Sequence, residues 1–243
     1  FACKCLREVW HLLTDERKYA HKAAVLLHRL ARYYPDYNYE TQSRYGLEFD
    51  HSYKGRLQYH TWECFTIQDV AVAYDAIWPA LAGDEELQAF CGADADQIRR
   101  DIEDRILRVA ATDIMDGSHR IQGNYGMHQS ALLRCALVLD TDQGTPTSAQ
   151  MVNWVMTGPE QVSLYTDTPI MDALINLFHR DGVPFESPSY NCSWMTELED
   201  VAEMLLLSGV NLWGEPRFQA LYRWPMQMLV CGTMTQPMGD SNN

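Results

Sequence analysis

Apolar residues recur three and four positions apart along most of the chain, a spacing typical of one face of an α-helix. The segments with this pattern are expected to be helices: residues 6–13, 23–34, 67–81, 98–109, 127–139, 170–178, 195–205 and 218–229. Residues 36–62 lack a clear period and are expected to form a long loop. Residues 140–168 are expected to hold only a short turn at 151–156. Pro225 is expected to kink the last helix.

Seven or eight helices with almost no strand pattern predict an all-α protein. Several predicted connections are short, which favours antiparallel neighbours, and no repeat of fixed length is present. An irregular series of antiparallel helical hairpins can close into an (α/α) toroid or stack as a solenoid. We expect one domain over residues 1–243, with loops between helices lining a groove at the open end of a ring.

Composition excludes some classes of partner. The 243 residues carry a net charge of −14, which argues against a nucleic-acid ligand and against a heavily sulfated one. No apolar run approaches the roughly 18 residues of a membrane span, so no membrane association is expected. The chain does not begin with Met, and we interpret it as processed or trimmed, so a missing signal peptide says nothing about export.

Seven scattered cysteines do not form a disulfide framework in a chain of this length. Cys3 and Cys5 have the wrong spacing for zinc, and no second pair completes a site. We expect mostly buried thiols and no metal. The tryptophans other than Trp62 are expected to pack in the core.

Two segments hold side chains suited to catalysis. Residues 181–191, which read Asp-Gly-Val-Pro-Phe-Glu-Ser-Pro-Ser-Tyr-Asn, contain two prolines and are expected to form a rigid loop that carries the Tyr190 phenol into a cleft. Residues 122–129, which read Gln-Gly-Asn-Tyr-Gly-Met-His-Gln, place Asn124 where a helix begins. An amide donor and a phenol on loops over a helical scaffold suggest chemistry on a carboxylated substrate.

The order of these motifs resembles that of the heparinase II/III-like polysaccharide lyases. Residues 123–129 are similar to the family's asparagine motif, and residues 181–190 to its tyrosine motif. The resemblance extends over nearly the whole chain through further segments: residues 19–23 with Tyr34-Pro35, Trp62-Glu63 with residues 73–75 and 78–79, and residues 236–241.

This resemblance implies an incomplete (α/α) toroid. In the family's full proteins a C-terminal β-sheet domain follows, which supplies a further catalytic histidine and, in some members, a metal. The chain stops at Asn243, where that domain would begin, so we expect the toroid alone, without a cofactor of its own. The resemblance also implies a secreted or periplasmic protein. It leaves the oligomeric state open.

Lyases of this type cleave beside a uronic acid by β-elimination. Asn124 is expected to donate a hydrogen bond to the substrate carboxylate as charge develops there, an effect worth about 3–4 kcal/mol in comparable sites. Tyr190 is expected to carry the proton as acid or base. Family members with a histidine base often carry it directly after the asparagine, and Tyr125 occupies that position here. His128, one turn further along, is not assigned the role of base.

The substrate-binding candidates are His128, Gln122, Tyr125, Trp62, Arg120 and Glu186. Each has a structural alternative: a helix cap for Asn124, a loop anchor for Tyr190, a core tryptophan for Trp62, and a loop brace for Glu186. Two rival functions stay open. A glycoside hydrolase would need two facing carboxylates, for which Glu63 and Glu186 are the nominees. A non-catalytic carbohydrate-binding domain would need neither.

Overall fold

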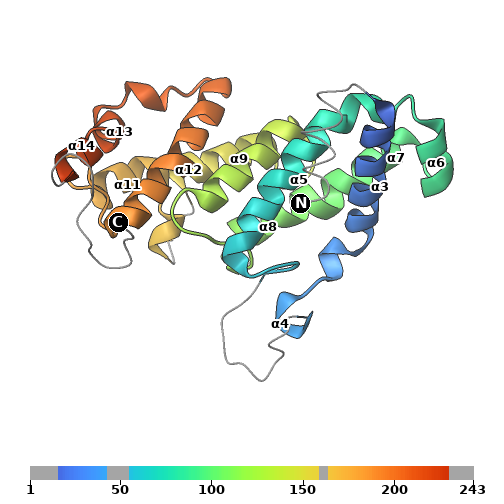
Figure 1. Ribbon diagram of the computed structural model, residues 1–243, viewed down its shortest axis with the longest axis horizontal. Helices are drawn as coiled ribbons and strands as arrows, with labels where there is room; N and C mark the ends of the chain where they lie inside the picture. The colour runs from blue at the N-terminus through green and yellow to red at the C-terminus, as the bar shows by residue number, and fades with distance from the viewer. Residues whose placement is uncertain (1–15, 43–54, 159–163, 230–243) are drawn as a thin grey trace.

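The computed structural model describes residues 16–42, 55–158 and 164–229 (Figure 1). Within these ranges the regular structure is helical without a strand, and one isolated β-bridge joins Phe178 to Pro184. The prediction of an all-α protein is therefore confirmed for the described part of the chain. The predicted helix at residues 6–13 and the segment 236–241 lie outside the described residues.

The helices are α3 (Arg17–Tyr33), α4 (Tyr39–Gln42), α5 (His60–Leu81), α6 (Glu85–Cys91), α7 (Ala95–Ile102), α8 (Arg108–Met115), α9 (Met127–Leu139), α10 (Ser148–Thr157), α11 (Ile170–Asn176), α12 (Pro188–Leu207), α13 (Pro216–Leu221) and α14 (Trp224–Met228). A π-helical turn, η3 (Glu103–Leu107), joins α7 to α8. Short 3₁₀ turns are η2 (Tyr34–Asp36), η4 (Tyr165–Asp167) and η5 (Leu212–Gly214).

Several expected boundaries were wrong. The stretch expected to hold only a short turn contains the ten-residue helix α10, which begins with a capping box in which Thr147 and Gln150 exchange hydrogen bonds. Helix α6 was not predicted, although the Asp84 carboxylate caps it by accepting a 2.8 Å bond from the Leu87 N–H. Pro225 does not kink one helix. It lies in the first turn of α14, after a break that separates α14 from α13.

The expected loop at 36–62 is partly helical. It includes α4, and α5 already begins at His60; residues 43–54 lie outside the described ranges. The tyrosine motif also differs from expectation. Helix α12 begins at Pro188, so Tyr190 is the third residue of a helix and does not lie on a loop.

Helix α9 is the centre of the packing. Ten of its thirteen residues are buried, which is typical of a helix surrounded by others. It packs against α5, α8, α10 and α12, and α5 packs in turn against α3. Figure 1 shows α6 and α7 at one end of this arrangement and α13 and α14 at the other.

Hydrogen bonds bring the starts of α5 and α9 together. The Gln122 N–H donates to the His60 carbonyl at 3.4 Å, and the Gln68 side-chain amide donates to the Met127 carbonyl at 3.0 Å. The second bond gives the carbonyl of Met127, the first residue of α9, a donor from the neighbouring helix α5.

A buried polar cluster fixes the entry to α5. The Glu63 carboxylate is fully buried and accepts bonds from the Tyr34 hydroxyl (2.9 Å) and the N–H groups of Leu57 (3.0 Å) and Gln58 (2.8 Å). Burial raises the pKa of Glu63, while these donors act in the opposite direction. Removing any one donor would leave a buried acceptor short of a partner.

The expected packing of the tryptophans and cysteines holds in part. Trp154, Trp194 and Trp224 are buried, but Trp78 is exposed and carries the Arg99 guanidinium 3.8 Å above its ring. Trp213 is half-buried, and Trp10 lies outside the described residues. Among the described thiols Cys64 and Cys135 are buried, Cys91 is half-buried and Cys192 is exposed. No helix of the described ranges is both long and apolar enough to cross a bilayer.

Candidate functional site

The asparagine and tyrosine motifs meet where α12 crosses the start of α9. Gly126 adopts a positive φ of 97°, and a Cβ at this position would lie 2.6 Å from the Glu197 Cβ of α12. Only glycine fits both the backbone conformation and this approach. The Glu197 carboxylate also lies 3.5 Å from the Gln68 amide of α5, so three helices converge at this point.

Aromatic side chains hold the two motifs together. The rings of Tyr125 and Trp194 pack with their centroids 4.7 Å apart, and Trp194 lies one helical turn after Tyr190 on α12. Tyr165 stacks on Trp194 at 6.3 Å, and Phe185 meets the edge of Tyr165 at 5.1 Å. Such contacts contribute about 0.5–1.5 kcal/mol each beyond burial.

Polar side chains of the asparagine motif bind the segment 164–168. The Gln122 amide donates to the Thr166 hydroxyl at 2.7 Å, and the Gln129 amide donates to the Thr166 carbonyl at 2.6 Å. The oxygen of Gln129 also accepts a 3.0 Å bond from the Gly126 N–H at the start of α9. One glutamine therefore closes the helix N-terminus and positions a neighbouring segment.

Two further contacts complete this attachment. The Tyr125 hydroxyl donates to the Thr168 carbonyl at 3.0 Å. His128 accepts a 3.4 Å bond at Nδ1 from the Gly123 N–H, and its Nε2 lies 3.3 Å from the Asp167 carboxylate. These contacts fix residues 166–168 against α9 over three consecutive positions.

Three of the expected substrate-binding residues therefore do not face solvent. Gln122, Tyr125 and His128 are 8%, 1% and 1% exposed. The Gln122 amide, the Tyr125 hydroxyl and the His128 Nδ1 form hydrogen bonds within the chain. Their contact with a substrate stays a prediction, and in this structure the three side chains lie against residues 166–168. Burial raises the pKa of the Tyr125 phenol, with a further contribution from Asp172, so this group stays protonated.

The segment so positioned presents Tyr165 at the surface. Its hydroxyl donates a 2.7 Å bond to the Glu186 carboxylate. Burial raises the pKa of Tyr165, and the bond to Glu186 and the charges of Glu186 and Tyr190 raise it further. Tyr165 is therefore a hydrogen-bond donor beside Tyr190, in a position to orient a carboxylate.

Glu186 was expected to brace its loop by accepting backbone N–H bonds. Its described partner is instead the Tyr165 phenol. The brace comes from Asn191, whose side-chain amide donates to the carbonyls of Pro184 and Glu186, each at 3.0 Å. The backbone of the loop is thus tied to α12 by Asn191, and the Glu186 side chain takes no part in this attachment.

The two expected catalytic residues are both half-buried. Tyr190 lies in the first turn of α12, close enough to Tyr165 to raise the pKa of that phenol. Asn124 lies in the turn before α9, and its carbonyl accepts a 3.0 Å bond from the Met127 N–H. The N-cap position of α9 is Gly126, so Asn124 is not the cap residue of this helix.

The side chains of Trp62 and Arg120 are accessible to solvent, so both could contact a ligand. Trp62 is 56% exposed in the first turn of α5, with its ring 5.9 Å from that of Phe65. It is therefore not a core residue. Arg120 is half-buried in the segment that leads into the asparagine motif, and no ion pair joins it to another described residue.

The carboxylate pair nominated for a hydrolase is not available. Glu63 is sealed in the cluster with Tyr34, whereas Glu186 lies at the surface beside Tyr165. In the described ranges no group of three His, Cys, Asp or Glu side chains is arranged to hold a metal ion.

Sequence reasoning missed three residues of this region: Tyr165, Gln68 and Glu197. Tyr165 lies in a stretch without periodicity, and its partner Glu186 is 21 positions away. Gln68 and Glu197 lie within regular helices, where their polar character suggested exposed faces. Burial raises the pKa of Glu197, the nearby Asp200 charge adds to this, and the Gln68 bond opposes it.

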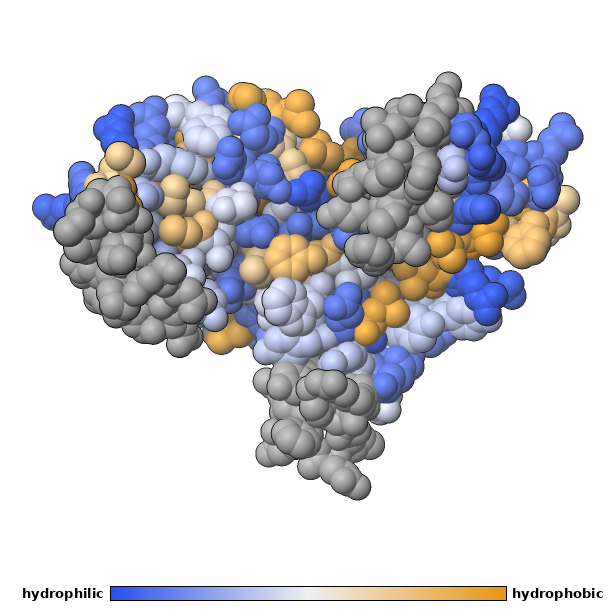
Figure 2. Space-filling view, in the orientation of Figure 1, coloured by the Kyte–Doolittle hydropathy of each residue, from blue (hydrophilic) through white to orange (hydrophobic). Residues whose placement is uncertain are grey.

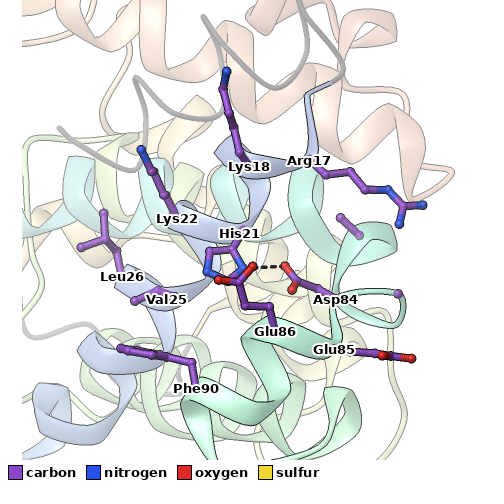
Figure 3. Close-up of a pocket in the computed structure, with 12 residues that line it drawn as sticks. Arg17, Lys18, His21, Lys22, Val25, Leu26, Asp84, Glu85, Glu86 and Phe90 are labelled. Atoms are coloured by element: carbon purple, nitrogen blue, oxygen red, sulfur yellow. Dashed lines mark hydrogen bonds and ion pairs between the residues drawn. The ribbon is translucent and has the colours of Figure 1, made fainter.

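A cavity of about 890 Å³ lies elsewhere, between α3 and α6 (Figure 3). It shares no lining residue with the region around Tyr190. Comparison of the chain with protein-family models, with curated proteins and with solved structures finds no match.

Proposed function

We propose that the protein is a polysaccharide lyase that cleaves a uronate-containing polymer by β-elimination, with Asn124 and Tyr190 at the reacting sugar. The observation that carries the proposal is the packing of Tyr125 on Trp194, which brings the turn holding Asn124 against the helix holding Tyr190. Both side chains are half-buried, so each keeps part of its surface open to a ligand.

In this proposal Asn124 donates to the substrate carboxylate as the C5 proton leaves. The carboxamide cannot itself be deprotonated, so it remains a donor throughout the reaction. Tyr190 gives its proton to the leaving glycosidic oxygen, and it can accept the C5 proton if it first ionises.

The charges near Tyr190 favour a polymer of modest charge. The carboxylates of Glu186 and Glu197 belong to this region, and they would repel a densely anionic chain. Exposed Trp62 offers an aromatic face for a sugar ring. A uronate polymer interrupted by neutral sugars fits this environment better than a sulfated one.

The proposal includes the finer fold implied by the family resemblance, an incomplete (α/α) toroid. The packing of α9 between α5 and α12 with α8 and α10 beside it supports that topology. The resemblance also implies a histidine from a C-terminal domain, so the assay uses the protein at its full natural length.

The test is a screen of uronate polymers for the unsaturated uronate that β-elimination leaves at the new end, which absorbs in the ultraviolet. If the protein is a lyase, each chain break should produce one unsaturated uronate end that absorbs in the ultraviolet. New reducing ends without absorbance would identify a hydrolase. Binding without any chain cleavage would identify a carbohydrate-binding domain, and either result contradicts the lyase proposal.

A further inference from the structure

A stripe of cations follows the solvent-facing side of α3. Lys18, Lys22, Arg29 and Arg32 are exposed and are spaced by four, seven and three residues, which places them on one helical face. No acidic residue interrupts this helix from Arg17 to its end. In a chain with a net charge of −14 such a concentration of positive charge is unexpected.

The stripe borders an apolar furrow. Two hollows, of about 890 and 240 Å³, share Val25 and Phe90 among their lining residues and so run together along α3. Phe90 is 73% exposed and Leu26 is 39% exposed. Figure 2 shows hydrophobic residues gathered over α3 and α6 at the right-hand end of the molecule, and Figure 3 places Val25, Leu26 and Phe90 near one another.

Two of the four acidic groups beside the furrow, Asp84 and Asp101, are already engaged. The Asp84 carboxylate caps α6 and lies 2.9 Å from the His21 ring, as the dashed line in Figure 3 marks. The Asp101 carboxylate lies 3.1 Å from the His28 ring. No ion pair joins Lys22 to any residue of the described ranges, and the same holds for the side chains of Arg29 and Arg32.

The remaining carboxylates lie at one end of the furrow. Glu85 and Glu86 belong to the first turn of α6, where the helix dipole favours negative charge. They line the larger hollow, where Figure 3 shows Glu86 beside His21, and they do not line the smaller one, whose cationic residues are Arg29 and Arg32. The Lys18 ammonium pairs with Glu16, and the larger hollow is lined by three cations and three carboxylates. The excess of positive charge therefore lies toward the smaller hollow, at Arg29 and Arg32, with Lys22 beside it.

This combination selects one kind of occupant. Neither a nucleic acid nor a polyuronate has aliphatic side chains to place beside Leu26 and Phe90. A flat membrane surface does not enter a furrow. A protein segment can supply both carboxylates for the stripe and apolar side chains for the hollow, as in helix-in-groove recognition.

We propose that the furrow along α3 is a docking site for an acidic segment of a partner protein. Its apolar side chains seat between Leu26 and Phe90, and its carboxylates pair with Lys22 and Arg29. Residues 18–32 span about 21 Å of helix, enough to contact four turns of a bound helix. This inference is independent of the lyase proposal.

The test begins with selection of a random 14-residue peptide library on the full-length protein. The enriched peptides are expected to be rich in Asp and Glu with central apolar residues. A labelled enriched peptide then reports binding by fluorescence anisotropy. The double variant Lys22→Glu, Arg29→Glu should weaken that binding at least tenfold, and Phe90→Ser should do the same without changing charge.

Matched controls alter equally exposed residues away from α3. Arg180→Glu combined with Arg223→Glu gives the same charge change, and Met226→Ser removes an apolar side chain that is 74% exposed. Both controls should leave the binding within about twofold of wild type. Failure to enrich acidic peptides, or equal losses in variants and controls, would overturn the proposal. So would tighter binding of a polyuronate, or self-association that Phe90→Ser abolishes.

Discussion

The Tyr165 hydroxyl donates a 2.7 Å hydrogen bond to the carboxylate of Glu186, four residues before Tyr190. Three buried side chains of the asparagine motif, Gln122, Tyr125 and Gln129, bind the segment that carries Tyr165. The two sequence motifs are thus connected through a residue that belongs to neither of them.

Replacing Tyr165 by Phe should keep the ring on Trp194 and remove only the donor. We expect about 0.5–1.5 kcal/mol of lost stability, together with a roughly tenfold fall in kcat/KM as Glu186 loses its orientation beside Tyr190. Tyr222→Phe is the matched control, because the Tyr222 hydroxyl donates to the Met195 carbonyl at 3.1 Å. It should lose similar stability with unchanged activity. Equal activity losses in both variants would show that the effect is only structural.

Two glutamines occupy the same position in their helices but differ in burial. Gln129 and Gln150 each accept a bond from the N-cap N–H, at 3.0 and 2.9 Å, but Gln129 is buried and also donates to Thr166. Gln129→Glu should lower the free energy of unfolding by about 2–3 kcal/mol. It buries a charge, and it places a carboxylate oxygen against the Thr166 carbonyl, where two acceptors then face each other. Gln150→Glu should change stability by less than about 0.5 kcal/mol. Urea unfolding of both variants measures the difference, and similar losses would contradict the role given to Gln129.

Two effects on stability can be separated at Gly126: the close approach of Glu197 and the positive φ of the glycine backbone. Gly209 also has a positive φ, of 85°, but a Cβ there meets nothing within 4 Å. Gly209→Ala should therefore cost only the conformational strain, about 1–2 kcal/mol. Gly126→Ala should cost about 1–3 kcal/mol more, because α12 must move away from α9. Thermal unfolding that ranks the two variants equally would argue against the contact with Glu197.

The stability contributed by Glu63 should depend on pH. Burial raises its pKa above the ordinary value of 4.5, so the folded protein holds the proton more tightly than the unfolded chain. Its contribution is then fully present below pH 4.5 and falls as the pH rises through the raised pKa. The excess stability of wild type over Glu63→Gln should therefore grow on acidification from neutral pH.

Denaturant unfolding across this pH range provides the measurement. The control is Glu86→Gln, which alters an exposed carboxylate on α6 and should leave the pH dependence as in wild type. A stability difference between wild type and Glu63→Gln that is constant with pH, or that shrinks on acidification, would contradict the buried environment of Glu63.

Periodicity predicted the long helices because each has a continuous apolar face. It missed α6, whose only buried residue is Leu87, so no repeat exists to detect. It also misjudged Pro188, which starts α12 at the position where a proline fits a helix best.

The candidate site was harder to predict than the helices. The sequence offered two candidate segments, but it did not indicate which of their polar side chains point inward. Gln122 and His128 have the chemistry of ligand-binding residues, and only the tertiary packing shows that they bind residues 166–167. Tyr165 could not be found, because its role depends on a contact across 21 positions of the chain.

The central claim is that Tyr190 transfers a proton in a β-elimination, and one comparison tests it most directly. Initial rates of unsaturated-uronate formation are measured for wild type, for Tyr190→Phe and for Tyr33→Phe, which alters a tyrosine that is 47% exposed on α3. Tyr190→Phe should lower kcat at least about 100-fold with its fold intact, and Tyr33→Phe should match wild type. Equal rates for Tyr190→Phe and wild type, or no absorbing product from any uronate polymer, would contradict the claim.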